Sequence, residues 1–229
     1  MAILRKASDR GHFDHGWLDT HHTFSFAGYR DPRHTGYRTL RVINEDRVKA
    51  GHGFGTHSHD NMEILSLVLS GSLKHEDSLG NGAVLRPGEV QYMSAGSGVR
   101  HSEFNPSSTE DVHFYQIWIE PDVRDAQPRY GQVKLSGESG WQTIATPAGE
   151  EGAIAIRQNA VVRYARVAGS TGLTVGPGRG LWLQVLSGTG TIAGAAVEAG
   201  TGVTIEEAGD HRFEGDGELL LFDLGPVTG

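Results

Sequence analysis

Two pairs of residues have the types and the spacing of metal ligands. His57 and His59 are separated by one residue, and His101 and Glu103 repeat that spacing further along the chain. Because successive side chains of a β-strand point to opposite faces, residues two positions apart share a face. Two such pairs on neighbouring strands would converge on one point. Three neutral imidazoles and one carboxylate suit a divalent metal such as iron, manganese, nickel, copper or zinc.

We therefore predict a metal site formed by His57, His59, His101 and Glu103. Four protein ligands leave one or two positions of an octahedral shell open, which a redox or Lewis-acid centre needs. The other histidines of the N-terminal part, including His52 and His75, are interpreted as surface, capping or structural residues. The same interpretation is given to five histidines near the N-terminus, which are His12, His15, His21, His22 and His34.

Short strands must position these ligands, because glycine-containing turns recur throughout the chain and 33 of its 229 residues are glycine. Strands are predicted at 39–44, 62–69, 72–77, 83–85, 90–93, 99–104 and 112–119. After them the same rhythm returns at 154–156, 161–167, 181–186, 189–192, 202–205 and 219–224. The segment 120–141 is rich in proline and glycine, and is expected to be an interdomain connection with one short helix at 121–127.

The sequence contains an internal repeat. Residues 65–73 match residues 182–190, and residues 86–90 parallel residues 198–202. A β unit of roughly a hundred residues therefore occurs twice. Antiparallel jelly rolls, of which cupins are one class, are built from such units. We predict an all-β bicupin of two jelly-roll β-barrels packed together, with domains at 1–130 and 131–229.

Composition excludes several functions. The net charge of −8 makes direct binding of nucleic acid unfavourable. The absence of cysteine rules out disulfides and thiolate ligands, and it fits a reducing cytosol. The first ten residues lack the apolar region of a signal peptide, and no apolar stretch approaches the roughly 18 residues of a membrane span. A cytoplasmic location without membrane contact is expected.

Longer motifs carry a family resemblance. The segment from Gly51 to Gly71 resembles the first cupin motif, with Gly71 one residue later than usual. Residues 88–105 resemble the second motif, with Ser94 in place of the usual proline and a longer gap before the histidine. The segments 57–65, 75–81, 86–96 and 101–105 resemble the pirin family, in particular its bacterial quercetin 2,3-dioxygenases. The resemblance is strong over residues 1–135 and weak in the C-terminal half.

The resemblance implies one metal, usually iron, in the N-terminal barrel, with the family's ligand set falling on His57, His59, His101 and Glu103. Fe(II) is the expected ion, and nickel, manganese, copper, zinc and cobalt are the alternatives. Since Glu103 fills the carboxylate role in the family pattern, Glu63 is expected to orient a ligand histidine and not to bind the metal.

The second copy of the repeat lacks these ligands. When Gly188 is matched with Gly71, the two histidines of the first motif fall on Thr174 and Gly176, and Glu63 falls on Gly180. His211 alone remains near the later histidine. One ligand cannot hold a metal, so the C-terminal domain is expected to have none.

The resemblance also implies quercetinase activity, the O2-dependent opening of the flavonol ring with loss of carbon monoxide. The partners are then a small aromatic, flavonol-like substrate and O2, and Glu103 is the catalytic proton acceptor. The alternative from another class is a metal-binding regulatory protein that binds a partner protein and does not turn over flavonols. A third reading is a cupin isomerase or a sugar-binding module. An open metal position beside an apolar cavity would favour the enzyme.

Overall fold

The computed structural model describes residues 2–226, apart from the side chain of Glu151, and it is almost entirely β-structure. The helices among these residues are two short 3-10 turns, η1 (Ala7–Asp9) and η2 (Glu150–Gly152). The chain divides into two compact units. We call residues 11–134 with 156–158 the N-terminal unit, and residues 2–10, 135–155 and 159–226 the C-terminal unit. The predicted all-β class with few short helices is confirmed.

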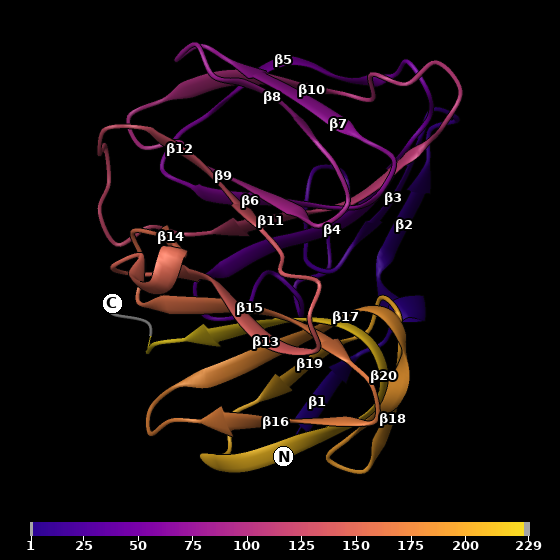
Figure 1. Cartoon of the computed structure of the whole chain (residues 1–229), viewed down its shortest axis with the longest axis vertical. Helices are drawn as coiled ribbons and strands as arrows, with labels where there is room; N and C mark the ends of the chain where they lie inside the picture. Colours follow the sequence, from indigo (N-terminus) through magenta and orange to yellow (C-terminus); the bar gives the residue numbers. More distant parts are fainter. Residues whose placement is uncertain (1, 227–229) are drawn as a thin grey trace. The chain divides into compact units, whose positions relative to one another are not determined.

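The N-terminal unit is built from two sheets, coloured indigo to magenta in Figure 1. The four-stranded sheet has the order β5-β10-β7-β8, and the seven-stranded sheet has the order β12-β9-β6-β11-β4-β3-β2. The strands of the first sheet are β5 (Gly53–His59), β7 (Leu73–Asp77), β8 (Gly82–Leu85) and β10 (Val99–Phe104). Those of the second are β2 (Gly11–Asp14), β3 (Leu18–His22), β4 (Leu40–Val48), β6 (Glu63–Ser70), β9 (Glu89–Ser94), β11 (Val112–Ile119) and β12 (Arg129–Lys134).

Alternation along the strands decides which side chains enter this unit. On β4 the apolar Val42 and Val48 share one face and are buried. Asn44 and Asp46 lie on the same face, so two polar side chains are carried into an otherwise apolar interior. On β10, His101 and Glu103 are buried while Phe104, on the other face, is 40% exposed.

Tight turns set the register between strands. Gly71, between β6 and β7, has a φ of 74°, a conformation that favours glycine. A Cβ atom there would run into the backbone of Asp111 and Val112. Gly188, its partner in the sequence repeat, has a φ of 81°, and a Cβ atom there would run into the backbone of Asp216. The same turn therefore occurs at the same place in both copies of the repeat.

The C-terminal unit has one nine-stranded sheet system centred on two long strands, β17 (Gly180–Ile192) and β20 (Gly209–Leu224). Its interior contains an apolar cluster that includes Leu183, Val203 and Phe213. The remaining strands are β1 (Ala2–Arg5), β13 (Gly140–Thr146), β14 (Ile154–Ala155), β15 (Ala160–Val167), β16 (Ser170–Val175), β18 (Ala195–Glu198) and β19 (Gly202–Ile205).

Residues 2–10 belong to the C-terminal unit, whereas the sequence-based division at residue 130 placed them in the first domain. The reason is a long-range pairing, in which β1 is antiparallel to β19 with Ala2 opposite Ile205. Residues 156–158 likewise belong to the N-terminal unit, where the Arg157 amide donates to Glu63 and the Gln158 side chain donates to the Glu120 carbonyl.

The predicted helix at 121–127 is wrong, since this segment consists of turns and bends. The expected connection at 120–141 is also interrupted by strand. β12 pairs with β9 over the whole range from Arg129 to Lys134. β12 is an edge strand with mostly exposed or half-buried residues, so it lacks the apolar pattern by which a strand is found in a sequence. No helix in the described part of the chain is long and apolar enough to span a membrane.

Candidate metal centre

Three imidazoles from two adjacent strands meet in the interior of the N-terminal unit. β10 is antiparallel to β5 with His101 directly opposite His57 and Val99 opposite His59. The register shifts between His101 and Glu103, so that Glu103 is opposite Phe54. The predicted pairing of two His-containing strands is therefore present, and His57, His59 and His101 form a group whose ligand atoms all lie within 4.8 Å of one another.

The spacing of the ring nitrogens fits a metal with ligands at right angles. The Nε2 atom of His101 lies 2.9 Å from Nε2 of His59 and 3.0 Å from Nε2 of His57. Imidazole nitrogens at about 2.0–2.1 Å from a metal are about 2.8–3.0 Å apart at a right angle, and about 3.3–3.4 Å apart in a tetrahedron. The observed separations match the right angle of an octahedral shell, so the donor set fits a divalent transition metal.

Hydrogen bonds fix which nitrogen of two of these rings carries the proton. Nδ1 of His57 lies 2.8 Å from the carbonyl oxygen of Gly55, which only accepts, so Nδ1 is the donor and Nε2 keeps its lone pair. Nδ1 of His101 lies 3.3 Å from Nδ1 of His75. The arrangement around His75 decides the direction of that bond.

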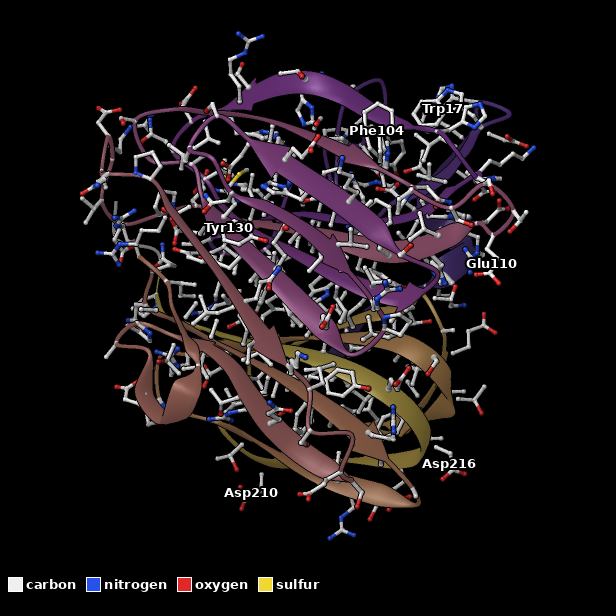
Figure 2. All side chains as sticks on the ribbon, turned by 45° about the horizontal axis from the view of Figure 1, so that its top comes forward. Trp17, Phe104, Glu110, Tyr130, Asp210 and Asp216 are labelled. Carbon is white, nitrogen blue, oxygen red and sulfur yellow. The ribbon has the colours of Figure 1, made fainter. Side chains whose placement is uncertain are left out.

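His75 is completely buried behind His101 on β7. Its Nε2 lies 3.2 Å from the Asp77 carboxylate, and its Nδ1 lies 3.3 Å from the side-chain nitrogen of Gln91. Nε2 is therefore the donor and Nδ1 the acceptor, so His101 donates from Nδ1 and presents a free Nε2 lone pair to the metal position. The ring of Tyr130, which lies in the N-terminal unit in Figure 2, stacks on His75 with centroids 5.4 Å apart.

Glu103 lies beside the three imidazoles but is not a member of the group that they form. Its carboxylate belongs to a second set with His75 and His101, and accepts hydrogen bonds from Ser66 at 3.3 Å and Gln116 at 2.9 Å. Since both nitrogens of His75 are engaged within the protein, this second set is poorly suited to bind a metal. Burial raises the pKa of Glu103, and the hydrogen bond from Gln116 opposes that shift.

The imidazoles of His59 and His101 are neutral over a wide range of pH. Burial lowers the pKa of His101 to about 3 and that of His59 to about 4, and in both cases the neighbouring His57 lowers it further. Neutral imidazole is the form that binds a metal. The surroundings therefore keep both rings ready to act as ligands at neutral pH.

A cavity of about 390 Å³ opens beside the imidazoles. This volume is within the range of small-molecule sites. His57, His59 and Glu103 line it from the four-stranded sheet, together with Phe54. The facing side is formed by the seven-stranded sheet and the loops next to it, through His15, Leu18, Thr20, His22, Phe26, Ala27, Asn44, Asp46, Gln116 and Trp118.

The wall opposite the imidazoles carries buried polar atoms that have no protein partner within the described residues. They are Nδ1 of His22, Oδ1 of Asn44, Oε1 of Gln116 and Nε1 of Trp118. Buried polar atoms are nearly always hydrogen-bonded in native proteins. Their collection around one cavity indicates that the cavity receives a ligand with polar groups as well as an apolar body.

Asp46 lies on the same wall and is also buried. Burial raises its pKa to about 7, while a hydrogen bond with Thr20 lowers it and the charge of Glu103 raises it further. The cavity therefore contains two carboxyl groups with raised pKa values, Asp46 on β4 and Glu103 on β10.

Sequence reasoning missed this wall. It placed His15 and His22 among the surface residues, but His22 is buried and both line the cavity. The available signal was a polar residue at an inward position of an apolar strand, as for Asn44 and Asp46 on β4 and for Gln116 on β11.

Glu63 also differs from expectation. It accepts hydrogen bonds from Tyr92, Ser94 at 2.6 Å and the Arg157 amide at 2.9 Å, and none of its recorded bonds among the described residues involves a ligand histidine. Its role is to hold residues 156–158 against β6 and β9.

The chain is similar in sequence to known proteins. The family model described as Pirin matches residues 4–119, and the model described as a quercetinase C-terminal cupin domain matches residues 143–224. A protein of Escherichia coli named quercetin 2,3-dioxygenase is 46% identical and aligns with 99% of this chain and 100% of its own length. A Pasteurella multocida protein provisionally given the same name is 40% identical, covering 98% of this chain and 100% of its own.

The chain is also similar to proteins whose structures have been solved. The crystal structure of the bacterial pirin YhhW from Escherichia coli in complex with nickel(II) has a TM-score of 0.95 and 44% identity, covering 99% of this chain and 100% of the other. A quercetin 2,3-dioxygenase from Acinetobacter baumannii, at 19% identity and a TM-score of 0.78, shares the fold. Matched by the family model over its first half and by these relatives over nearly its full length, the chain belongs to the pirin family.

Proposed function

We propose that this protein is a metal-dependent dioxygenase that acts on flavonols such as quercetin, with O2-dependent ring cleavage and release of carbon monoxide. The observation that carries the proposal is the position of the His57, His59 and His101 imidazoles beside a largely apolar cavity. The side of the cavity opposite the imidazoles also carries buried polar atoms. The names of the Escherichia coli and Pasteurella multocida relatives support the same activity.

The proposed ligands are His57, His59, His101 and Glu103. Three imidazoles from adjacent strands supply the right-angled part of the shell, and Glu103 would supply the fourth ligand from its place beside His101. Fe(II) remains the expected metal, and the nickel complex of YhhW makes nickel the first alternative. When bound, the metal supplies Lewis acidity and a centre at which an electron-rich phenolate and O2 can react.

Glu103 is the proposed proton acceptor. A flavonol hydroxyl must lose its proton before the ring can be oxidised, and Glu103 borders the cavity from within the unit. Burial raises the pKa of its carboxyl group, which strengthens it as a base relative to an exposed glutamate. Ser66 and Gln116 hold its two oxygens in place for this transfer.

The opposite wall binds and orients the planar substrate. Phe26 and Trp118, whose rings meet edge to face at 5.3 Å, present aromatic surface to the cavity. The free polar atoms of His22, Asn44 and Gln116 are proposed to pair with substrate hydroxyl groups away from the reacting edge. A planar substrate that fills this cavity would exclude water from the reacting atoms.

We also propose a cytoplasmic location and a division into two domains, at 1–130 and 131–229. The C-terminal unit is proposed to lack the metal, because Thr174 and Gly176 stand in the sequence repeat where the first copy has its two motif histidines. The chain's last histidine, His211, contacts the Glu207 carbonyl at 2.8 Å.

The test is oxygen consumption with quercetin, on protein stripped of metal and reloaded with Fe(II), Ni(II) and other divalent ions in parallel. Wild type is compared with His101→Ala, Glu103→Ala and the control His211→Ala. We expect metal-dependent turnover in wild type and in the control, and its loss in the other two variants.

Wild type could instead bind metal stoichiometrically, lose that binding in His101→Ala, and show no turnover with any metal. That result would contradict the oxygenase activity and favour the regulatory alternative. Carbon monoxide release, measured in the same samples, separates ring cleavage from simple oxidation of quercetin.

A further inference from the structure

The Asp46 carboxyl group faces the cavity beside the imidazoles and takes no part in the proposed proton transfer. Asp46 is 5% exposed and lines the cavity from β4 of the seven-stranded sheet. Its hydrogen bond is with Thr20, the residue directly opposite on β3. A carboxylate offers about four acceptor positions on its two oxygens, so this bond leaves most of them for a ligand. Buried aspartates without a pairing partner are rare, which makes a role for Asp46 in the cavity worth deriving.

Strand register puts further hydrogen-bond acceptors next to Asp46. Asn44 is two residues away on the same face of β4, and Gln116 is directly opposite Asn44 on β11. Gln116 donates from Nε2 to Glu103, so its Oε1 is left as an acceptor. Oδ1 of Asn44 is also buried without a protein partner among the described residues. This part of the wall therefore presents oxygen acceptors from three neighbouring side chains.

Such a wall selects an uncharged ligand that carries hydrogen-bond donors on an apolar ring. Phenolic hydroxyl groups are donors of this kind. The ring has apolar partners in Leu18 and Phe54, which line the cavity and pack in one apolar cluster. An aromatic carboxylate is disfavoured, because Asp46 and Glu103 both border the cavity and would repel its negative charge. The ligand class is therefore a polyhydroxylated aromatic compound.

A carboxylate matches one arrangement of hydroxyl groups better than the others. Hydroxyl groups on adjacent ring carbons lie about as far apart as the two oxygens of a carboxylate, so both can donate to it at once. The same match of parallel donors and paired oxygens makes bidentate hydrogen bonds to carboxylates strong and geometrically specific. Hydroxyl groups on alternate ring carbons are too far apart for this arrangement. Asp46 is therefore suited to a catechol, the ring with two adjacent hydroxyl groups.

We propose that Asp46 determines substrate specificity by binding two adjacent phenolic hydroxyl groups, so that the protein prefers flavonols whose outer ring is a catechol. This inference rests on the proposed function of the cavity and assigns the part of the substrate that the β4 wall recognises. Asn44 and Gln116 then accept hydrogen bonds from the remaining hydroxyl groups. Glu103, on the opposite sheet, stays available for the hydroxyl group that reacts.

The test is anaerobic binding of three flavonols to the nickel(II)-loaded protein, measured by calorimetry at pH 8. Quercetin has two adjacent hydroxyl groups on its outer ring, kaempferol has one and galangin has none, and the three are otherwise identical. Wild type should bind quercetin at least tenfold more tightly than galangin, with kaempferol between them. Asp46→Asn, which preserves size, should lose about tenfold in quercetin affinity and keep its galangin affinity within about twofold. The exposed control Asp14→Asn should match wild type for all three.

Three results would overturn the proposal: no binding of any flavonol to wild type, equal wild-type affinities for quercetin and galangin, or equal losses for the two in Asp46→Asn. Oxygen uptake by the same proteins in air separates this inference from the proposed function. Selective binding without turnover would contradict the dioxygenase and still support recognition of the catechol by Asp46. Turnover without selectivity would do the reverse. Nickel stoichiometry and thermal unfolding verify that each variant is folded and loaded.

Discussion

The side-chain nitrogen of Gln116 donates to a carboxylate oxygen of Glu103 at 2.9 Å, and this bond links the two sheets of the N-terminal unit. Gln116 is on β11 of the seven-stranded sheet, while Glu103 is on β10 of the four-stranded sheet. The proposed proton acceptor is thus held by a residue from the opposite wall of the cavity. The other amide atom of Gln116, Oε1, is free to meet a ligand.

Gln116→Leu should remove this link with little change in volume. Without its donor, the Glu103 carboxylate loses its fixed orientation, and partners of this kind typically contribute 10–100-fold to metal affinity or activity. We expect a fall of about that size in kcat for quercetin, measured by oxygen uptake at saturating metal. Gln116→Glu cannot donate as an ionised side chain and should be at least as impaired. An unchanged kcat in both variants would contradict the role of Gln116.

Asp77→Asn should weaken metal binding although the Asp77 carboxylate makes no recorded hydrogen bond to a proposed ligand. The Asp77 carboxylate makes Nε2 of His75 the donor, which in turn makes Nδ1 of His101 the donor. An asparagine amide can donate to His75 instead, which would reverse both bonds and put a proton on Nε2 of His101. We expect a 10–100-fold loss of nickel(II) affinity by calorimetry.

Asp77 also accepts from the Leu79 and Asn81 amides in the turn after β7, so the variant needs a stability control. Asn81→Ala disturbs the same turn and leaves the contact of Asp77 with His75. Its nickel affinity should equal that of wild type, and thermal unfolding shows whether both variants are folded. Equal losses of affinity in the two variants would assign the effect to the turn.

Asp46→Asn should stabilise the metal-free protein at alkaline pH. The pKa of Asp46 is about 7 in the folded protein and ordinarily about 3.8, so between these values the folded state holds a proton that the unfolded state releases. The stability that this proton contributes is present below the lower value and is lost as pH rises towards 7. Asparagine has no such loss.

The melting temperature of Asp46→Asn minus that of wild type should therefore grow between pH 5 and pH 8, with a free-energy difference on the order of a few kcal/mol. Exposed Asp14→Asn is the matched control and should show no such trend. The lowered pKa of His22 acts in the opposite direction at acid pH, and it cancels because both proteins contain His22. A difference that stays constant with pH would show that Asp46 does not titrate in this range.

Asn44→Leu should raise stability and impair substrate recognition together. Oδ1 of Asn44 is buried without a protein partner among the described residues, and such an atom costs about 1–3 kcal/mol. Leucine removes that cost but cannot accept a hydrogen bond from a substrate hydroxyl. We expect a higher melting temperature and about a tenfold higher KM for quercetin, with unchanged metal stoichiometry.

Comparing quercetin with 3-hydroxyflavone, which lacks the other hydroxyl groups, isolates the hydrogen bond. Wild type should prefer quercetin in kcat/KM, and Asn44→Leu should lose most of that preference. A parallel loss for both substrates would mean that Asn44 shapes the cavity and does not read the hydroxyl groups.

The all-β fold class, the internal repeat and the meeting of three imidazoles could be predicted from the amino-acid sequence. These depend on local rules: alternation along a strand puts His57 and His59 on one face, and the conformation at Gly71 and Gly188 marks the same turn in both copies. A ligand pair and a glycine turn can therefore be found from short spacings alone.

The residues that surround the imidazoles could be identified only from the folded protein. His75 lies behind His101, and the cavity wall that faces the imidazoles contains Asn44 and Gln116. These contacts, like the pairing of β1 with β19, join residues that are far apart in the chain. Such contacts depend on which strands become neighbours and in which register, and a one-residue slip would turn every side chain to the other face. The tautomer of His101 and the buried carboxyl groups follow from that register, and no spacing in the sequence encodes them.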